Sequence, residues 1–128
     1  DPRWGRGHET YGEDPYLTSR LGVQFIEGLQ GEGEYLKTAA CAKHFAVHSG
    51  PEGLRHSFDA KATPKDMWET YLPAFETAVK DADVESVMGA YNRTNGEPCG
   101  IFSEENGISR DILFPTAGLS GISTPTIW

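Results

Sequence analysis

Apolar residues at a step of four predict a helix in the first third of the chain. Asp14 followed by Pro15 is a typical helix beginning, because the carboxylate can serve as N-cap and proline suits the first turn. Four residues then give one apolar stripe: Leu17, Leu21, Phe25 and Leu29. Gly31 has the backbone freedom that ends a helix. The pattern therefore predicts a helix over 15–30.

A second helix is predicted from Pro64 onward. Thr63 precedes it, and Asp66 stands three residues later, as in a capping box. Pro73 lies inside the apolar pattern, so we expect a local kink there. Six residues of this helix are expected to face the core: Met67, Trp68, Tyr71, Leu72, Phe75 and Val79.

Two continuous apolar runs alternate with these helices and predict buried strands. They are LKTAACAKHF at 36–45 and VESVMGAYN at 84–92. A polar loop, RTNGEPCG, follows the second run, and FSEENGISRDIL begins a third helix. Because helices and continuous apolar strands alternate, the fold class is α/β with parallel strands covered by helices.

The composition argues against two classes of binding partner, nucleic acids and membranes. The 128 residues carry a net charge of -8, which argues against nucleic acid, because phosphate binding needs a surplus of Lys and Arg. No apolar run approaches the roughly 18 residues of a membrane helix, so no membrane partner is expected. The chain opens on Asp1, so we expect its natural start to lie upstream and the cellular compartment stays open. We interpret Cys41 and Cys99 as small buried residues.

Ionisable residues gather where the two predicted strands end. Lys43 and His44 close the first strand, and Tyr91 closes the second. The carboxyl ends of parallel strands are where α/β folds place their sites. Neighbouring strand residues point to opposite faces, so Lys43 and His44 reach one site only where the strand is ending. A cation beside a histidine suits sugar hydroxyls or a phosphate; the alternative is a structural salt bridge.

Three further patterns contain residues that could bind a ligand. Arg6 stands between Gly5 and Gly7, and its planar donors suit a carboxylate or vicinal hydroxyls. The alternative is a loop-stapling arginine paired with Glu9 or Asp14. His44 and His48 have the i, i+4 spacing of a helical metal pair, but Gly50 and Pro51 argue against a helix, so no metal is expected. The triplet Asn92-Arg93-Thr94 matches a glycosylation acceptor, a weak signal at a strand end.

Four motifs carry a resemblance: DPRWGRGHETYGEDPYL, CAKHFAVHSGPEGLRH, ETYLPAFETAVK and VMGAYNRTNGEPC. In order and spacing they resemble the N-terminal barrel domain of glycoside hydrolase family 3, in its β-glucosidase and β-xylosidase branch. The resemblance covers 1–113 and implies a partial (β/α)8 TIM-like barrel. The tail 114–128 does not match, and we interpret it as an out-of-frame translation.

The resemblance implies a sugar site and no metal or cofactor. The family's members are retaining, exo-acting β-glycosidases of carbohydrate catabolism. Arg6, Lys43 and His44 match its motifs and would hold hydroxyls of the sugar before the scissile bond. Tyr91 would neighbour the nucleophile, and Glu52 would shape the loop around the pocket. The substrate would be a small-molecule or oligosaccharide β-glycoside, with glucoside and xyloside both open.

The chain also departs from the family. The resemblance implies an Asp nucleophile after the third helix and a Glu acid/base in a second domain. No Asp or Glu follows Asp111, which belongs to the predicted third helix. The catalytic pair, the rest of the barrel and the second domain are therefore missing, and we expect this chain alone to be inactive. The alternatives are an inactive sugar-binding remnant and a non-enzymatic α/β interaction domain.

Overall fold

The computed structural model describes residues 4–98. Its helices and strands run in this order: η1 (Gly7–Glu9), α1 (Pro15–Gln30), β1 (Cys41–Phe45), η2 (Glu52–Leu54), β2 (Asp59–Ala60), α2 (Pro64–Asp66), the π-helical turn η3 (Met67–Tyr71), α3 (Pro73–Lys80), β3 (Ser86–Gly89), β4 (Arg93–Thr94) and β5 (Glu97–Pro98). The predicted third helix, Cys99 and the tail lie outside the described residues.

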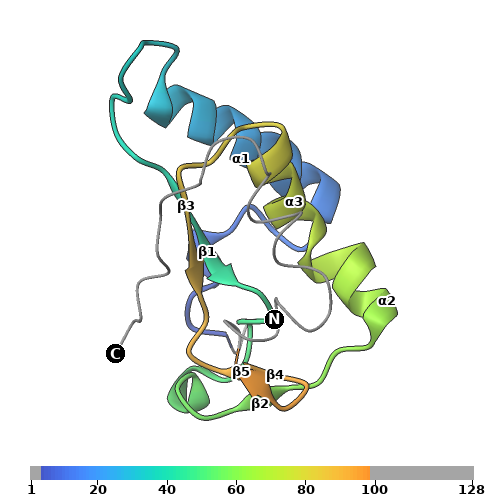
Figure 1. Ribbon diagram of the computed structural model, residues 1–128. Coiled ribbons are helices and arrows are strands. Elements are labelled where there is room, and N and C mark those ends of the chain that lie inside the picture. Colours follow the sequence, from blue (N-terminus) through green and yellow to red (C-terminus); the bar gives the residue numbers. More distant parts are fainter. Residues whose placement is uncertain (1–3, 99–128) are drawn as a thin grey trace.

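The strands β1 and β3 form a parallel pair, with Cys41 opposite Ser86. Helices α1 and α3 pack against each other on one side of this pair (Figure 1). The predicted α/β class with parallel strands and covering helices is therefore confirmed. Closure into a (β/α)8 barrel stays a prediction, because the two paired strands are only part of such a sheet. No helix of the described part combines the length and the apolar character of a membrane span.

The predicted helix ends are confirmed. The carboxylate of Asp14 accepts a hydrogen bond from the backbone N–H of Tyr16, and Gly31 ends α1 with a φ of 72°. At α2, Thr63 and Asp66 form both halves of a capping box. These caps depend on neighbours in sequence, which explains why the sequence locates them well.

The apolar stripe of α1 is not its buried face. Leu17, Leu21 and Phe25 are 46%, 43% and 58% exposed. The buried face consists instead of Ser19, Val23, Ile26 and Gln30. Its polar members bond backbone: the Ser19 hydroxyl donates to the carbonyl of Pro15, and the Gln30 amide bonds the backbone of Asp83 and Glu85. Such bonds let polar groups replace apolar ones inside the protein.

The second helix is interrupted rather than kinked. After α2 the backbone passes through η3, and α3 begins afresh at Pro73. The expectation for Trp68 was wrong, since it is 48% exposed, whereas Met67, Leu72 and Val79 are buried. The wider π-helical turn shifts the direction of each following side chain, so one helical period cannot describe the whole segment.

Three expectations about strands and loops need correction. β3 is not a buried strand, because Met88 is 43% exposed, and Cys41 at the start of β1 is exposed too. The described helices cover only one side of the β1–β3 pair (Figure 1). The supposed polar loop after β3 contains the hairpin β4–β5, which turns at Asn95 and Gly96 with φ of 53° and 93°. β4 also pairs in parallel with β2.

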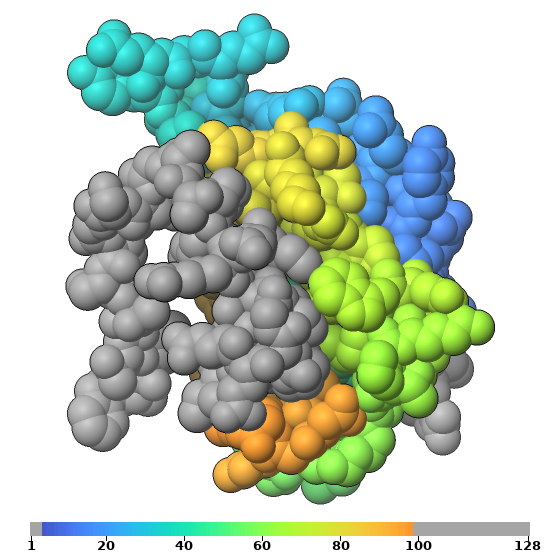
Figure 2. All heavy atoms as spheres, turned by 45° about the vertical axis from the view of Figure 1, so that its right-hand side comes forward, coloured from blue at the N-terminus to red at the C-terminus, as the bar shows by residue number. Residues whose placement is uncertain are grey.

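Two apolar clusters hold these elements together. One lies between α1 and α3 and centres on Val23, Ile26 and Ala78. The other lies under the loop that follows β1 and includes Phe45, Met67 and Leu72. Figure 2 shows α1 and α3 side by side on the surface, with the segment after α1 projecting beyond them.

Candidate functional site

The end of β1 meets the loop that opens the described chain. The Lys43 ammonium lies 2.8 Å from Oε2 of Glu9. The same carboxylate accepts two hydrogen bonds from Arg6, at 2.7 Å from Nε and 2.8 Å from Nη2. Glu9 therefore joins two cations that are 37 residues apart in sequence, and the structure brings the predicted site residues Arg6 and Lys43 together.

His44 lies in the same group and packs on a second histidine. The centroids of the His44 and His48 rings are 4.2 Å apart. His48 is 8% exposed, and the indole of Trp4 meets it edge-on at 5.7 Å. The register of β1 against β3 is irregular between Lys43 and Phe45, where the strand ends. The charges of Arg6, Lys43 and Glu9 all act on His44, so Lys43 and His44 belong to one group of side chains. Their service to one sugar site stays a prediction.

Charge and burial set the protonation states of this group. Hydrogen bonds from Arg6 and then Lys43 lower the pKa of Glu9 to about 2. Burial, followed by the charges of His48, Arg6 and Lys43, lowers the pKa of His44 to about 4. The pKa of His48 is lowered as well, first by burial. At neutral pH the site therefore holds a carboxylate, two cations and two uncharged imidazoles.

The loop after β1 contains a second group of polar contacts. Arg55 Nη1 lies 3.0 Å from Oε1 of Glu52, and Arg55 Nε donates to Nε2 of His56 at 3.1 Å. The His56 ring stacks on Tyr91, with centroids 4.5 Å apart. A side chain on Gly5 would meet Cγ of Glu52 at 3.3 Å, so Gly5 allows the opening loop to approach this one.

The five predicted site residues fall into two groups of contacts. Arg6, Lys43 and His44 gather around Glu9, whereas Glu52 and Tyr91 are linked through Arg55 and His56. The approach of Gly5 to Glu52 joins the two groups, which together are called the rim below. Tyr91 itself is 67% exposed. Their roles toward a ligand stay predictions.

Sequence reasoning missed three residues of this group: Trp4, Glu9 as the link to Lys43, and the buried His48. The signal for Glu9 was present, because it stands three residues after Arg6, one turn of η1 away. No local pattern pairs Glu9 with Lys43. Asn92 of the glycosylation triplet is 1% exposed and donates to the carbonyl of Val47 at 2.8 Å, so it is inaccessible in this fold.

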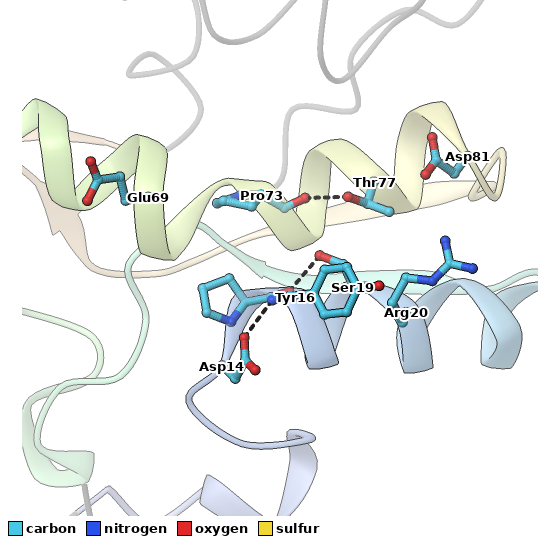
Figure 3. Close-up of a pocket in the computed structure, with 9 residues that line it drawn as sticks. Asp14, Tyr16, Ser19, Arg20, Glu69, Pro73, Thr77 and Asp81 are labelled. Atoms are coloured by element: carbon cyan, nitrogen blue, oxygen red, sulfur yellow. Dashed lines mark hydrogen bonds between the residues drawn. The ribbon is translucent and has the colours of Figure 1, made fainter.

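A separate hollow of about 480 Å³ lies between α1 and α3 (Figure 3). Its lining includes Asp14, Arg20, Glu69 and Asp81, and no residue of the rim contributes to it. The hydroxyls of Ser19 and Thr77, which face it, are already bonded to carbonyls of their own helices. Within residues 4–98, no three His, Cys, Asp or Glu side chains are placed to hold a metal ion.

The rim suits binding of neutral polar ligands. Glu9 engages two donors of Arg6 and one of Lys43, so each cation keeps further N–H donors. A neutral imidazole at His44 can donate from one nitrogen and accept at the other. Hydroxyl groups both donate and accept hydrogen bonds, so they match the N–H donors of Arg6 and Lys43 together with the acceptor nitrogen of His44. A proton donor to a leaving group would need a raised carboxyl pKa, and that of Glu9 is lowered.

Comparison with known proteins gives consistent matches. The family described as the glycosyl hydrolase family 3 N-terminal domain matches residues 1–122. A xylan 1,4-β-xylosidase of Xylanibacter ruminicola is 61% identical over 102 residues, covering 77% of this chain and 12% of the relative. A solved family 3 exo-β-xylosidase, in complex with a xylobiose aziridine probe, shares 44% identity with a TM-score of 0.73 over 77% of this chain and 14% of that one.

A β-glucosidase structure from Erythrobacter marinus matches as well, with 34% identity and a TM-score of 0.75 over 87% of this chain and 15% of that one. The chain therefore spans a small part of the length of these relatives. The family match extends beyond Leu113, where the resemblance in the sequence was expected to end; the domain boundary at that residue stays a prediction.

Proposed function

The chain belongs to glycosyl hydrolase family 3, and we propose that it supplies part of the sugar-binding wall of a retaining, exo-acting β-glycosidase. In this proposal the rim around β1 and β3 receives the terminal sugar of a β-glycoside. The nucleophile, the acid/base, the rest of the barrel and a second domain come from sequence beyond the described residues. The activity serves breakdown of carbohydrates and needs no cofactor.

One observation carries the proposal: Arg6, Lys43 and His44 converge, with Glu9 joining the two cations at 2.7–2.8 Å. The motifs assign a sugar-binding role to these three residues, and the fold brings them together from two distant segments. Their remaining donors and the neutral imidazole match vicinal hydroxyls in chemical type. In this proposal Tyr91 and Glu52 contact the sugar from the loops that follow β3 and β1.

The sugar we propose is xylose. The relative at 61% identity is named a xylan 1,4-β-xylosidase, and a solved relative at 44% is an exo-β-xylosidase. The matched β-glucosidase structure has a lower identity, 34%. Glucose differs from xylose by a hydroxymethyl group, and a pocket that closes around that position distinguishes the two. A β-glucoside is therefore the competing substrate.

The test is a hybrid enzyme. The segment of this chain that matches the Xylanibacter ruminicola xylosidase replaces its counterpart in that enzyme. We expect the hybrid to hydrolyse aryl β-xylosides faster than aryl β-glucosides, and Lys43→Ala to abolish the activity. Lys65→Ala is the control, because Lys65 forms an exposed pair with Glu69 on a remote helix. A folded but inactive hybrid would contradict the proposal and favour an inactive sugar-binding remnant.

A further inference from the structure

Glu9 has no role in any motif assignment above, yet it contacts both cations of the rim. Both of its oxygens are engaged, Oε1 by Arg6 Nε and Oε2 by Arg6 Nη2 and Lys43 Nζ. The Arg6 contact is bidentate, the geometry in which a carboxylate fixes the plane of a guanidinium. Arg6 and Lys43 are therefore oriented by one carboxylate.

Stability does not explain this arrangement. The side chains of Arg6, Glu9 and Lys43 are 22%, 32% and 38% exposed, and ion pairs with such access to water contribute little to folding. An arginine and a lysine that contact the same carboxylate would also repel each other without it. The effect of Glu9 is therefore on position: it holds two like charges on one side of the site.

Position matters because both cations are flexible alone. Arginine and lysine lose much rotamer freedom when they are ordered, and a ligand must otherwise supply that ordering. Glu9 orders them before the ligand arrives. It also occupies one edge of the guanidinium, so the free N–H groups of Arg6 and Lys43 are those directed away from Glu9.

We propose that Glu9 is a positioning residue, which acts through Arg6 and Lys43 to set the geometry of sugar binding. This inference rests on the proposed function. Glu9 contacts no sugar itself in this account, and it transfers no proton. Its carboxylate must stay ionised to act, in keeping with its lowered pKa.

The test compares two carboxylates in the hybrid enzyme. Glu9→Gln keeps the size of the side chain but aims an amide N–H group at a cation. Glu76→Gln is the matched control, because Glu76 pairs with Lys80 at 2.7 Å on α3, outside the rim. We expect kcat/KM for an aryl β-xyloside to fall about 100-fold in Glu9→Gln, the scale of an ångström-sized displacement of a binding group. Glu76→Gln should stay within about twofold of the parent, as surface pairs usually do.

A double-substitution cycle separates positioning from general disruption. The cycle is measured as the affinity of the hybrid for xylose, by calorimetric titration. If Glu9 acts through Lys43, then Glu9→Gln lowers that affinity much less when Lys43 is already Met, because coupled residues are not additive. Equal losses in both backgrounds would overturn the inference. In the full 128-residue chain, the Nε–H signal of Arg6 in ¹⁵N NMR spectra should also move on Glu9→Gln and stay unchanged on Glu76→Gln.

The outcomes distinguish the two proposals. An active hybrid whose kcat/KM is unchanged by Glu9→Gln overturns the role of Glu9 and leaves the proposed function standing. A folded hybrid without any activity overturns the proposed function, and the positioning role with it. Thermal unfolding of each variant identifies a loss of activity that comes from unfolding; in that case Glu9→Asp, which keeps the charge, must recover part of the activity.

Discussion

The imidazole of His56 lies nearly parallel to the phenol ring of Tyr91, with ring centroids 4.5 Å apart and an angle of 28° between the planes. Tyr91 follows the end of β3, and His56 belongs to the loop that follows β1. The stack therefore ties the loops at the ends of two paired strands to each other. Arg55 extends this link to Glu52 through hydrogen bonds to His56 and Glu52.

Substitution of Tyr91 tests whether this stack shapes the sugar site. Tyr91→Ala removes the ring, and we expect xylose affinity to fall about three- to tenfold, since aromatic pairs contribute roughly 0.5–1.5 kcal/mol. Tyr91→Phe keeps the ring and should bind like the parent if only the stack matters. Calorimetric titration of the hybrid enzyme with xylose measures both. Equal losses in the two variants would instead assign the effect to the phenol hydroxyl.

Gly50 is predicted to stabilise the fold of the same loop. A Cβ atom there would overlap the ring of Phe58, which packs on the apolar cluster around Phe45. Because a packed ring has little room to move, Gly50→Ala should destabilise the chain by about 1–3 kcal/mol. Gly53→Ala is the matched control, with open space at its Cβ position. Urea denaturation measures both, and equal midpoints would contradict the overlap.

The sequence predicts those features that depend on close neighbours. The caps at Asp14 and Thr63 follow from residues within three positions, and the structure contains both. The buried face of α1 could not be predicted from hydrophobicity, because Ser19 and Gln30 are buried through hydrogen bonds, one of them to backbone more than 50 residues away. The polarity of neighbouring residues does not indicate hydrogen-bond partners that are distant in sequence.

The candidate site, too, has residues that the sequence predicts and residues that depend on distant contacts. The motifs pointed to Arg6, Lys43 and His44, and the end of β1 agrees with the last two. The contact between Glu9 and Lys43 joins residues 34 apart, and η1 brings Glu9 to the rim. His48 was considered only as a metal ligand. Its place under His44 depends on how the chain turns after β1, which no periodic pattern encodes.

Stability should fall with acid in a window set by His44. Its pKa is lowered from 6.5 to about 4 by burial and by His48, Arg6 and Lys43, against an opposing effect of Glu9. Its contribution is fully present above pH 6.5 and is lost as the pH falls to about 4, because the unfolded chain binds a proton that the folded chain excludes. The free energy of unfolding, measured by urea denaturation from pH 7 to 4.5, should decrease.

His44→Asn is the control for that window. It removes one titrating group, so the decrease between pH 6.5 and 4.5 should become shallower than in the parent. His48 titrates in the same direction and leaves a residual slope. The pKa of Glu9 is lowered from 4.5 to about 2, so the stability that its carboxylate contributes is lost between about pH 4.5 and pH 2, below this window. Identical slopes for parent and variant would contradict the assignment to His44.

The exposed stripe of α1 predicts self-association of the isolated chain. Leu17, Leu21 and Phe25 present an apolar face on a helix whose other side is packed. Phe25→Glu should increase the soluble, monomeric fraction severalfold, as measured by size-exclusion chromatography. Val23→Glu adds the same charge at a position that is 4% exposed, and it should abolish folding. A parent chain that is already monomeric and melts reversibly would contradict this prediction.

The 128-residue chain alone should not hydrolyse aryl β-xylosides or aryl β-glucosides above the buffer rate. Retaining hydrolysis needs a carboxylate nucleophile and a second carboxyl group that donates a proton. Glu9 serves neither purpose, because Arg6 and Lys43 engage both of its oxygens and lower its pKa to about 2. No Asp or Glu follows Asp111. Turnover by the purified chain that Lys43→Ala abolishes would contradict this expectation, and it would mean that another carboxylate of this chain reaches the sugar.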